Sequence, residues 1–309
     1  MAPPSSFPLR TKIEALIAVV LFGCIPVVVR SLSANAWTIG IFRLAVATAV
    51  LSLLLLARGE MRGVTPANLV RLAVIGFLFF GHWLSFFFAI KASSASIAAI
   101  GLSTYGIALL IFGAIAARRR PAAIDIIAVM LAATGAVLVV PSLDISNAVT
   151  AGMLLAVLSA LFYAALPILH QRWAVIASSQ RTLGQFGFAL LFFLLFAGSA
   201  DWDLGARDWW GLLFLALGPT LIAHSLWVRV TTTIPAEKTS IIYYGNLPFA
   251  VILSSLILGE ALTGRILLGG LLIAAGSLLG LVRRSRLAPA AGVEGEKPRE
   301  GAIAPPRAS

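Results

Sequence analysis

The chain has 309 residues, of which 60% are hydrophobic and only 11% are charged, and its mean hydropathy is +1.00. Soluble domains carry about 25% charged residues on average, so this composition excludes an ordinary water-soluble fold. The net charge of +11 could suggest nucleic-acid binding, but no basic patch interleaved with aromatic residues lies on a polar segment. The single cysteine, Cys24, lies inside the first apolar run, which excludes a disulfide framework and a cysteine-based metal site.

From the N-terminus onward, apolar runs follow one another, each long enough to cross a bilayer core of about 30 Å. A short polar lead, 1–11, precedes them; it has no small-residue cleavage site, and this favours an uncleaved first helix. Residues 283–309 form a tail rich in Pro, Gly, Glu and Arg, which we expect to be cytoplasmic and disordered. The expected spans are 12–32, 37–56, 68–90, 94–117 and 122–141, then 150–171, 182–200, 209–230, 236–258 and 265–282.

The two sets of five spans read as one unit written twice, 12–141 and 150–282. Gly276 stands 141 residues after Gly135, and Pro167 stands 141 residues after Pro26, without a gap. Because five is an odd number, the second copy must enter the membrane from the opposite face. The sequence therefore predicts an all-α integral membrane protein of ten transmembrane helices in two inverted five-helix repeats, an arrangement typical of secondary transporters.

The distribution of Lys and Arg sets the orientation. With a cytoplasmic N-terminus, 18 of the 23 basic residues lie at cytoplasmic ends, 4 lie on the other side, and Arg43 lies within a span. This asymmetry follows the positive-inside rule and explains the high charge without any nucleic acid. Both termini are predicted to be cytoplasmic.

Three features carry a family resemblance: the five-plus-five pattern, the span of Pro248 that closes in Gly259-Glu260-Ala261-Leu262-Thr263, and the Ala274-Ala275-Gly276 helix. Over about residues 10–286 the chain resembles the drug/metabolite transporter superfamily, in particular its EamA-type repeats. More narrowly it resembles the bacterial aromatic amino acid exporters. In the first copy, Ile107 stands where the second copy has Pro248, and Arg118-Arg119 stand where it has Gly259-Glu260.

The resemblance implies a multi-pass exporter of the bacterial inner (cytoplasmic) membrane. Its substrate cavity would lie between the halves, lined mostly by the first, third, fourth, sixth, eighth and ninth helices. The implied partners are the lipid bilayer and a small-molecule substrate, an amino acid, and no cofactor is implied. One chain holding both copies could act as a monomer.

Polar and aromatic side chains inside the spans are the candidates for substrate binding. All four tyrosines lie within spans, although tyrosine favours membrane interfaces. Asn246 is the repeat equivalent of Tyr105, and Thr239, Tyr243, Asn246 and Ala250 share one helical face. Hydrogen bonding between packed helices is the alternative role. The candidate substrate-binding residues are His82, Tyr105, Tyr163, Tyr243, Asn246, Trp83 and His224.

His82 and His224 lie within spans that carry no Asp or Glu near mid-membrane, so the carboxylate relay of many proton pumps is missing. Either histidine could titrate or could simply be hydrogen-bonded in the packing, and both readings stay open. No further ligands for a zinc ion are visible, so we predict no metal site.

Mid-span prolines and glycines are the candidate hinges: Pro26, Pro167, Gly101, Gly245 and Pro248. A proline removes one helical hydrogen bond and kinks its helix, which suits a rocking motion or a static bend equally.

Three function classes compete. An enzyme would need a nucleophile with its base, or a metal cluster, and no catalytic set stands out. A channel would need a charged ring or a filter sequence, which is also absent. A structural membrane protein, such as an assembly factor with the same duplication, is a further alternative outside these three classes, which are a transporter, an enzyme and a channel. The sequence favours a transporter of aromatic or other neutral amino acids by alternating access, with a different small metabolite or drug as the alternative cargo.

Overall fold

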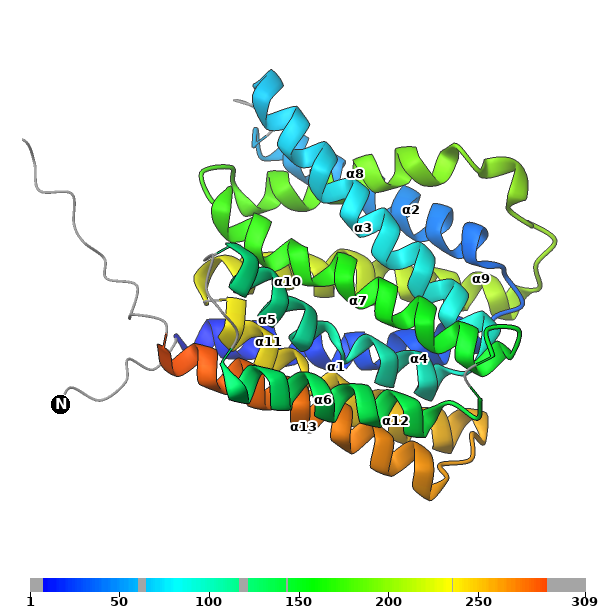
Figure 1. The fold of residues 1–309 in the computed structure, drawn as a ribbon. Coiled ribbons are helices and arrows are strands. Elements are labelled where there is room, and N and C mark those ends of the chain that lie inside the picture. The colour runs from blue at the N-terminus through cyan, green and yellow to red at the C-terminus, as the bar shows by residue number, and fades with distance from the viewer. Residues whose placement is uncertain (1–7, 61–64, 117–121, 143, 235, 288–309) are drawn as a thin grey trace, which may run out of the picture.

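The structure, a computed structural model, describes residues 8–60, 65–116, 122–142, 144–234 and 236–287. Over these residues the fold is entirely helical, as the sequence predicts (Figure 1). The first repeat unit holds α1 (Leu9–Ser31), α2 (Ala36–Ala57), α3 (Pro66–Ala92), α4 (Ala95–Leu102), α5 (Tyr105–Ala116) and α6 (Ala123–Val139). The second holds α7 (Ala148–Arg172), α8 (Ser178–Leu194), η1 (Ala197–Ser199), α9 (Ala206–Leu215), η2 (Ala216–His224), α10 (Ser225–Thr233), α11 (Ala236–Tyr243), α12 (Asn246–Leu258) and α13 (Gly264–Leu287).

Six helical stretches in the described part are long and apolar enough to cross a membrane by length and composition. They are Leu9–Ser31, Ala36–Ala57, Pro66–Ala92, Ala148–Arg172, Ala206–Thr233 and Ile241–Leu258. Three shorter apolar helices accompany them, at Ala95–Leu109, Ala123–Val139 and Gly264–Leu279. Helix α8 belongs to neither group, because Gln180, Arg181 and Gln185 lower its hydropathy.

The terminal helices are longer than the expected spans. Helix α1 begins at Leu9, directly after Pro8, whose carbonyl accepts from the Lys12 amide. Helix α13 continues to Leu287, so 283–287 of the expected tail are helical. The rest of the expected lead and tail, 1–7 and 288–309, lies outside the described residues.

The fifth helices of the two units, α6 and α13, pack along their length and run antiparallel (Figure 1). A Cβ on Gly135 would lie 2.5 Å from the Gly269 carbonyl oxygen, and a Cβ on Gly276 would lie 2.5 Å from the Ala128 carbonyl oxygen. These two contacts are repeat equivalents, since each residue of one pair stands 141 positions from a residue of the other. The packing therefore repeats the sequence symmetry, with equivalent helices pointing in opposite directions.

The fourth helix of each unit is broken, although the sequence reads as a continuous span in both places. Helix α4 ends at Leu102 and α11 ends at Tyr243, 141 residues later; α5 and α12 then begin at Tyr105 and Asn246, again 141 apart. The two breaks therefore fall on equivalent residues.

Local hydrogen bonds explain both breaks. At the first, the Ser103 and Thr104 hydroxyls donate to the carbonyls of Ile100 and Gly101 at 2.6 and 2.8 Å, which competes with continuation of the helix. At the second, the Gly245 amide turns back to the Ile242 carbonyl at 3.0 Å. The breaks also meet each other: the Tyr244 hydroxyl donates to the Ser103 carbonyl.

A π-helical stretch, η2, interrupts the long helix between α9 and α10. Pro219 lies inside it and cannot donate a backbone hydrogen bond, and the Thr220 hydroxyl donates to the Leu215 carbonyl at 2.7 Å. Single turns of π-helix are rare and often lie at functional sites. Helix α3, the equivalent element of the first unit, is an uninterrupted α-helix that packs between α7 and α8.

Candidate functional site

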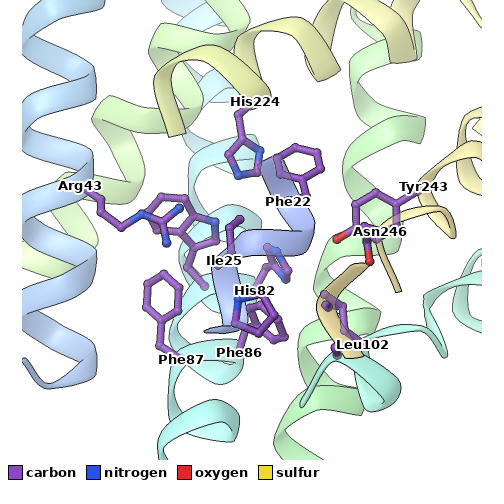
Figure 2. A pocket seen from close by; sticks show the side chains of 14 residues that line it. Phe22, Ile25, Arg43, His82, Phe86, Phe87, Leu102, His224, Tyr243 and Asn246 are labelled. Atoms are coloured by element: carbon purple, nitrogen blue, oxygen red, sulfur yellow. The ribbon is translucent and has the colours of Figure 1, made fainter. Parts of the chain in front are cut away.

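A small cavity lies where α1, α2, α3, α4, η2, α11 and α12 meet, next to the broken helices (Figure 2). Its walls are mostly apolar, with four large aromatic rings, and five polar or charged side chains lie among them. The lining residues are Phe22, Ile25, Pro26, Arg43, His82, Trp83, Phe86, Phe87, Ala99, Leu102, His224, Tyr243, Asn246 and Ala250. We call this space the central cavity.

The central cavity is closed in the described conformation. About 20 Å³ is open to the centre of a water molecule, which is enough for one or two waters but not for an amino acid. Arg43 is 0% exposed, and His82, Trp83 and Tyr243 are buried as well. A molecule as large as an amino acid can therefore enter only after the groups around the cavity move apart.

Arg43 lines the cavity from α2, with its guanidinium over the aromatic side chains of α3 (Figure 2). Its guanidinium carbon stands 4.1 Å from the centre of the Trp83 ring and 5.3 Å from that of Phe87. Its Nε donates to the Thr220 hydroxyl at 3.0 Å, so the π-helical stretch η2 fixes one edge of the guanidinium. The other edge, Nη1 and Nη2, has no hydrogen-bond partner in the described part of the chain.

The energetics show how unusual this arrangement is. An arginine inside a membrane costs about 2.5–3.5 kcal/mol on insertion scales, and a fully buried ion costs several kcal/mol. A desolvated cation–π contact offsets about 2 kcal/mol, and a hydrogen bond to a charged group about 1.5–3 kcal/mol. Nη1 and Nη2 each carry two N–H donors, and leaving them unmet costs a further 1–3 kcal/mol or so apiece. Arg43 therefore carries unsatisfied hydrogen-bond donors at the cavity wall.

His82 is held by a neighbour on α7. Its Nδ1 lies 2.7 Å from the Ser159 hydroxyl, which in turn donates to the His82 carbonyl at 2.9 Å. A hydroxyl has one hydrogen, so when both bonds form Nδ1 carries the imidazole proton and Nε2 is an acceptor. The ring also stacks on Tyr163 at 4.5 Å between centroids. The sequence left open whether His82 is simply hydrogen-bonded in the packing. Its Nδ1 edge is hydrogen-bonded to Ser159, and the same ring also lines the cavity.

His224 lies on the opposite wall, at the end of η2, among Phe22, Phe79 and Trp83. Its Nε2 is buried and has no hydrogen-bond partner in the described residues. Among those same residues, no group of three or more His, Cys, Asp or Glu side chains lies close enough to hold a metal ion.

The four tyrosines form one cluster between the halves. Tyr105 and Tyr163 each place their ring 5.1 Å from that of Tyr243, and Tyr105 lies 5.9 Å from Tyr244. Of the four, Tyr243 lines the central cavity, while Tyr163 lines a smaller space next to it together with His224. The cluster therefore adjoins the cavity through Tyr243.

Of the seven residues proposed from the sequence for substrate binding, five line the central cavity: His82, Trp83, His224, Tyr243 and Asn246. Tyr105 and Tyr163 stand one layer behind them and support Tyr243. The expected shared face of 239–250 holds for Tyr243, Asn246 and Ala250 in spite of the helix break, because all three line the cavity.

The candidate hinges lie close by. Pro26 lines the central cavity, and its equivalent Pro167 lines the smaller space beside Tyr163. Gly245 stands at the second helix break, and Pro248 in the first turn of α12. Gly101 lies in the last turn of α4, where a Cβ would come within 2.6 Å of the Ala156 Cβ.

Polar contacts close the bundle at the end where α1 begins, which we call the near end. The Arg229 guanidinium of α10 lies 3.1 Å from the Glu14 carboxylate of α1. Arg181 of α8 donates to the His170 carbonyl and, at 2.7 Å, to the Thr232 hydroxyl. These bonds tie α1, α7, α8 and α10 together.

A second set of contacts closes the far end, where α1 finishes. The Asp208 carboxylate accepts from the Ser33 amide at 2.7 Å and from its hydroxyl at 2.6 Å. The Glu260 carboxylate accepts from the amides of Ala95 and Ser96 at 2.8 and 2.9 Å, at the N-terminus of α4. Each contact joins one half of the chain to the other.

Sequence reasoning missed Arg43, which it noted only as a charge within a span, and missed the second helix as part of the cavity wall. An ionisable residue inside a membrane span is by default a candidate for function, and that signal could have found it. The aromatic wall of Phe22, Phe86 and Phe87 was also missed, because phenylalanines are common in any apolar span.

Comparisons with known proteins agree with this architecture. The sequence profile of the EamA-like transporter family matches residues 11–140 and, a second time, residues 150–282. Among solved structures, 25 chains match. One of them, a crystal structure described only as that of a protein, is 18% identical with a TM-score of 0.64, over 90% of this chain and 99% of the other. At that identity the likeness shows the fold alone. No curated protein matches the chain.

Proposed function

Since the chain belongs to the EamA-like transporter family, we propose that it is a secondary transporter that exports small metabolites by alternating access around the central cavity. Members of this family are membrane transporters of small molecules rather than enzymes. Aromatic and other neutral amino acids are the proposed cargo, and another small metabolite or a drug is the second candidate.

The observation that carries this proposal is the pair of helix breaks beside the central cavity. They fall on equivalent residues of the two units, next to Asn246 and Tyr243 in the second. Discontinuous helices at matching places in two inverted repeats mark the substrate site of many secondary transporters. The antiparallel pair α6 and α13 supports the inversion, because equivalent helices of inverted repeats must point opposite ways.

The proposed cargo follows from the cavity walls. The rings of Phe22, Trp83, Phe86 and Phe87 suit an aromatic or apolar body, and the polar groups of Asn246 can bond a backbone-like amine or carbonyl. A drug-like aromatic compound could pack against the same rings, so a drug is retained as the second candidate cargo.

Within this proposal, the protein spans the bacterial inner membrane ten times, with both termini in the cytoplasm. The charge count of 18 against 4 supports this orientation. Single cysteines at Asp144, on the loop between α6 and α7, and at Ser309, at the end of the chain, test it in a Cys24→Ser background. We expect an impermeant maleimide to label Asp144→Cys in intact cells and Ser309→Cys only after lysis. The reverse pattern would show that the orientation is wrong.

Flux in proteoliposomes tests transport itself. Purified protein is reconstituted with an internal pool of one unlabelled amino acid, and uptake of the labelled compound is followed over a panel of aromatic, aliphatic and charged amino acids. We expect exchange of aromatic and neutral members above the level of protein-free vesicles. Absence of exchange for every compound in correctly inserted protein would contradict the proposed function.

A further inference from the structure

We infer that Arg43 is an anion subsite, which binds a carboxylate group of the transported molecule. The inference rests on the proposed function, since it gives the chemical class of the cargo that the central cavity would take. The proposed cargo, a neutral amino acid or another small metabolite or drug, is thereby narrowed to molecules that carry a carboxylate on an apolar body.

The geometry of the guanidinium is the first argument. Thr220 holds Nε, and the ring faces of Trp83 and Phe87 hold the plane of the group. The remaining edge, Nη1 and Nη2, is the one without protein partners, and the residue lines the cavity. Two parallel N–H groups on one edge match the two oxygens of a carboxylate, which is the strongest fit that arginine makes.

Charge is the second argument. Among the described residues that line the central cavity, Arg43, His82 and His224 are the ones that can carry a positive charge, and none is acidic. The described ion pairs lie elsewhere, at Glu14 near the start of α1. Arg43 therefore has no protein counter-ion at the cavity, and an anionic group of the cargo would supply one.

The cavity wall that faces Arg43 limits which groups the rest of the cargo molecule can carry. Figure 2 shows Tyr243 and Asn246 across the cavity from Arg43, with Phe22 and Phe86 between them. An aromatic body would lie against these rings, and an ammonium group could reach the oxygens of Tyr243 and Asn246. An amino acid and a simple aryl carboxylic acid both satisfy Arg43, and they differ only in this second contact.

A purely structural role is the competing explanation. In that case Arg43 clamps α2 to α3 and η2 through Trp83 and Thr220, and its free edge has no ligand. The two roles differ in one measurable property. A ligand contact makes the protein prefer a carboxylate over its uncharged amide, whereas a clamp gives no preference between them.

The first experiment uses the unaltered protein. Purified chains in detergent are titrated with phenylalanine, phenylalanine amide and 3-phenylpropionate, and binding is read from thermal stabilisation. We expect the two carboxylates to bind at least tenfold more tightly than the amide. Equal binding of acid and amide overturns the inference, whether or not any variant folds.

The second experiment uses variants in the same assay. Arg43→Gln should reduce the acid-over-amide ratio to about one, and Arg43→Lys should keep part of it. The matched control is Arg181→Gln, which removes an equally buried arginine whose contacts are with His170 and Thr232 at the near end. It should leave the ratio unchanged. An unchanged ratio in Arg43→Gln would overturn the inference.

The outcomes separate this inference from the proposed function. Proteoliposomes that exchange amides and acids equally well would leave transport intact and remove the carboxylate subsite. Tight, Arg43-dependent binding of acids without any exchange would leave the subsite and remove the transporter. Within the carboxylates, tighter binding of phenylalanine than of 3-phenylpropionate assigns the ammonium contact to Tyr243 and Asn246.

Discussion

The two halves of the chain share their framework but differ in the chemistry they bring to the cavity. Residues at the α6–α13 contact and at the helix breaks have equivalents 141 positions away that do the same work. Most of the side chains that line the cavity have equivalents of different chemistry. The equivalent of Arg43 is Gly184, which packs on Leu72 and does not line the cavity, and the equivalent of Trp83 is His224, which lines the cavity with a different ring. In the proposed mechanism, symmetry is therefore kept where the halves would move alike and is lost where an asymmetric cargo would bind.

The glycines of the framework should show the largest effect. Gly135→Ala and Gly276→Ala each force a Cβ to within 2.5 Å of a backbone oxygen on the partner helix. We expect a loss of about 3 kcal/mol in each, the upper range for overpacking. Thermal unfolding in detergent measures it, with Gly198→Ala, where nothing lies within 4 Å, as the control. Clearly unequal losses in the two variants would break the symmetry of this contact.

Cavity side chains should affect binding more than stability. His82→Ala and Asn246→Ala should each weaken apparent affinity by about 5- to 100-fold, because a buried partner left unsatisfied costs about 1–3 kcal/mol. Tyr105→Ala should cost less, since its ring supports Tyr243 without lining the cavity. Uptake in proteoliposomes measures all three beside Trp210→Ala, an exposed interfacial control. Equal losses in Trp210→Ala at equal expression would remove support for the cavity.

The π-helical stretch η2 occurs only in the second unit of the described chain, and its contact with Arg43 can be tested at Thr220. Thr220→Val removes the hydroxyl that accepts the hydrogen bond from Arg43 Nε, whereas Thr220→Ser keeps that hydroxyl. We expect about a fivefold loss of affinity in the valine variant, or about 1 kcal/mol, and little change in the serine variant. If valine and serine behave alike in the binding assay, η2 does not position Arg43.

The prolines should show the smallest effect. Pro26→Ala and Pro167→Ala restore a helical hydrogen bond and stiffen α1 and α7 near the cavity. We expect transport to slow by about two- to threefold, a barrier change of about 0.5 kcal/mol, without loss of folded protein. Initial rates of exchange measure it. Unchanged rates in both variants would mark the prolines as static bends.

Much of the framework could be read from the sequence. Apolar length located the helices, and the fixed offset between glycines and prolines predicted two equivalent units. The breaks at Ser103–Thr104 and Tyr244–Gly245 could not be predicted in this way, because hydropathy averaged over a span is insensitive to one missing backbone bond. They depend on side-chain bonds such as those of Ser103 and Thr104, which compete with the helix only in the folded context.

Only some of the residues that line the cavity could be predicted from the sequence. Interior tyrosines and histidines stand out in an apolar span, so His82, Tyr243 and Asn246 were found. The position of Arg43 depends on Trp83 of the next helix and on Thr220 of η2. Thr220 lies 177 residues after Arg43 in the chain. Only the folded chain brings these three side chains together.

The hydrogen bond from the Tyr244 hydroxyl to the Ser103 carbonyl joins two residues that are each other's repeat equivalents. In a transporter whose two states exchange the conformations of its halves, most contacts are traded for their equivalents. The ion pair at the near end, for example, would give way to a contact between two apolar residues, Leu155 and Phe88. A pair of mutual equivalents instead maps onto itself in either state. If the chain works in this way, positions 103 and 244 stay next to each other in both states and can serve as the pivot between the halves, although the bond from the Tyr244 side chain to the Ser103 backbone would be exchanged for its counterpart.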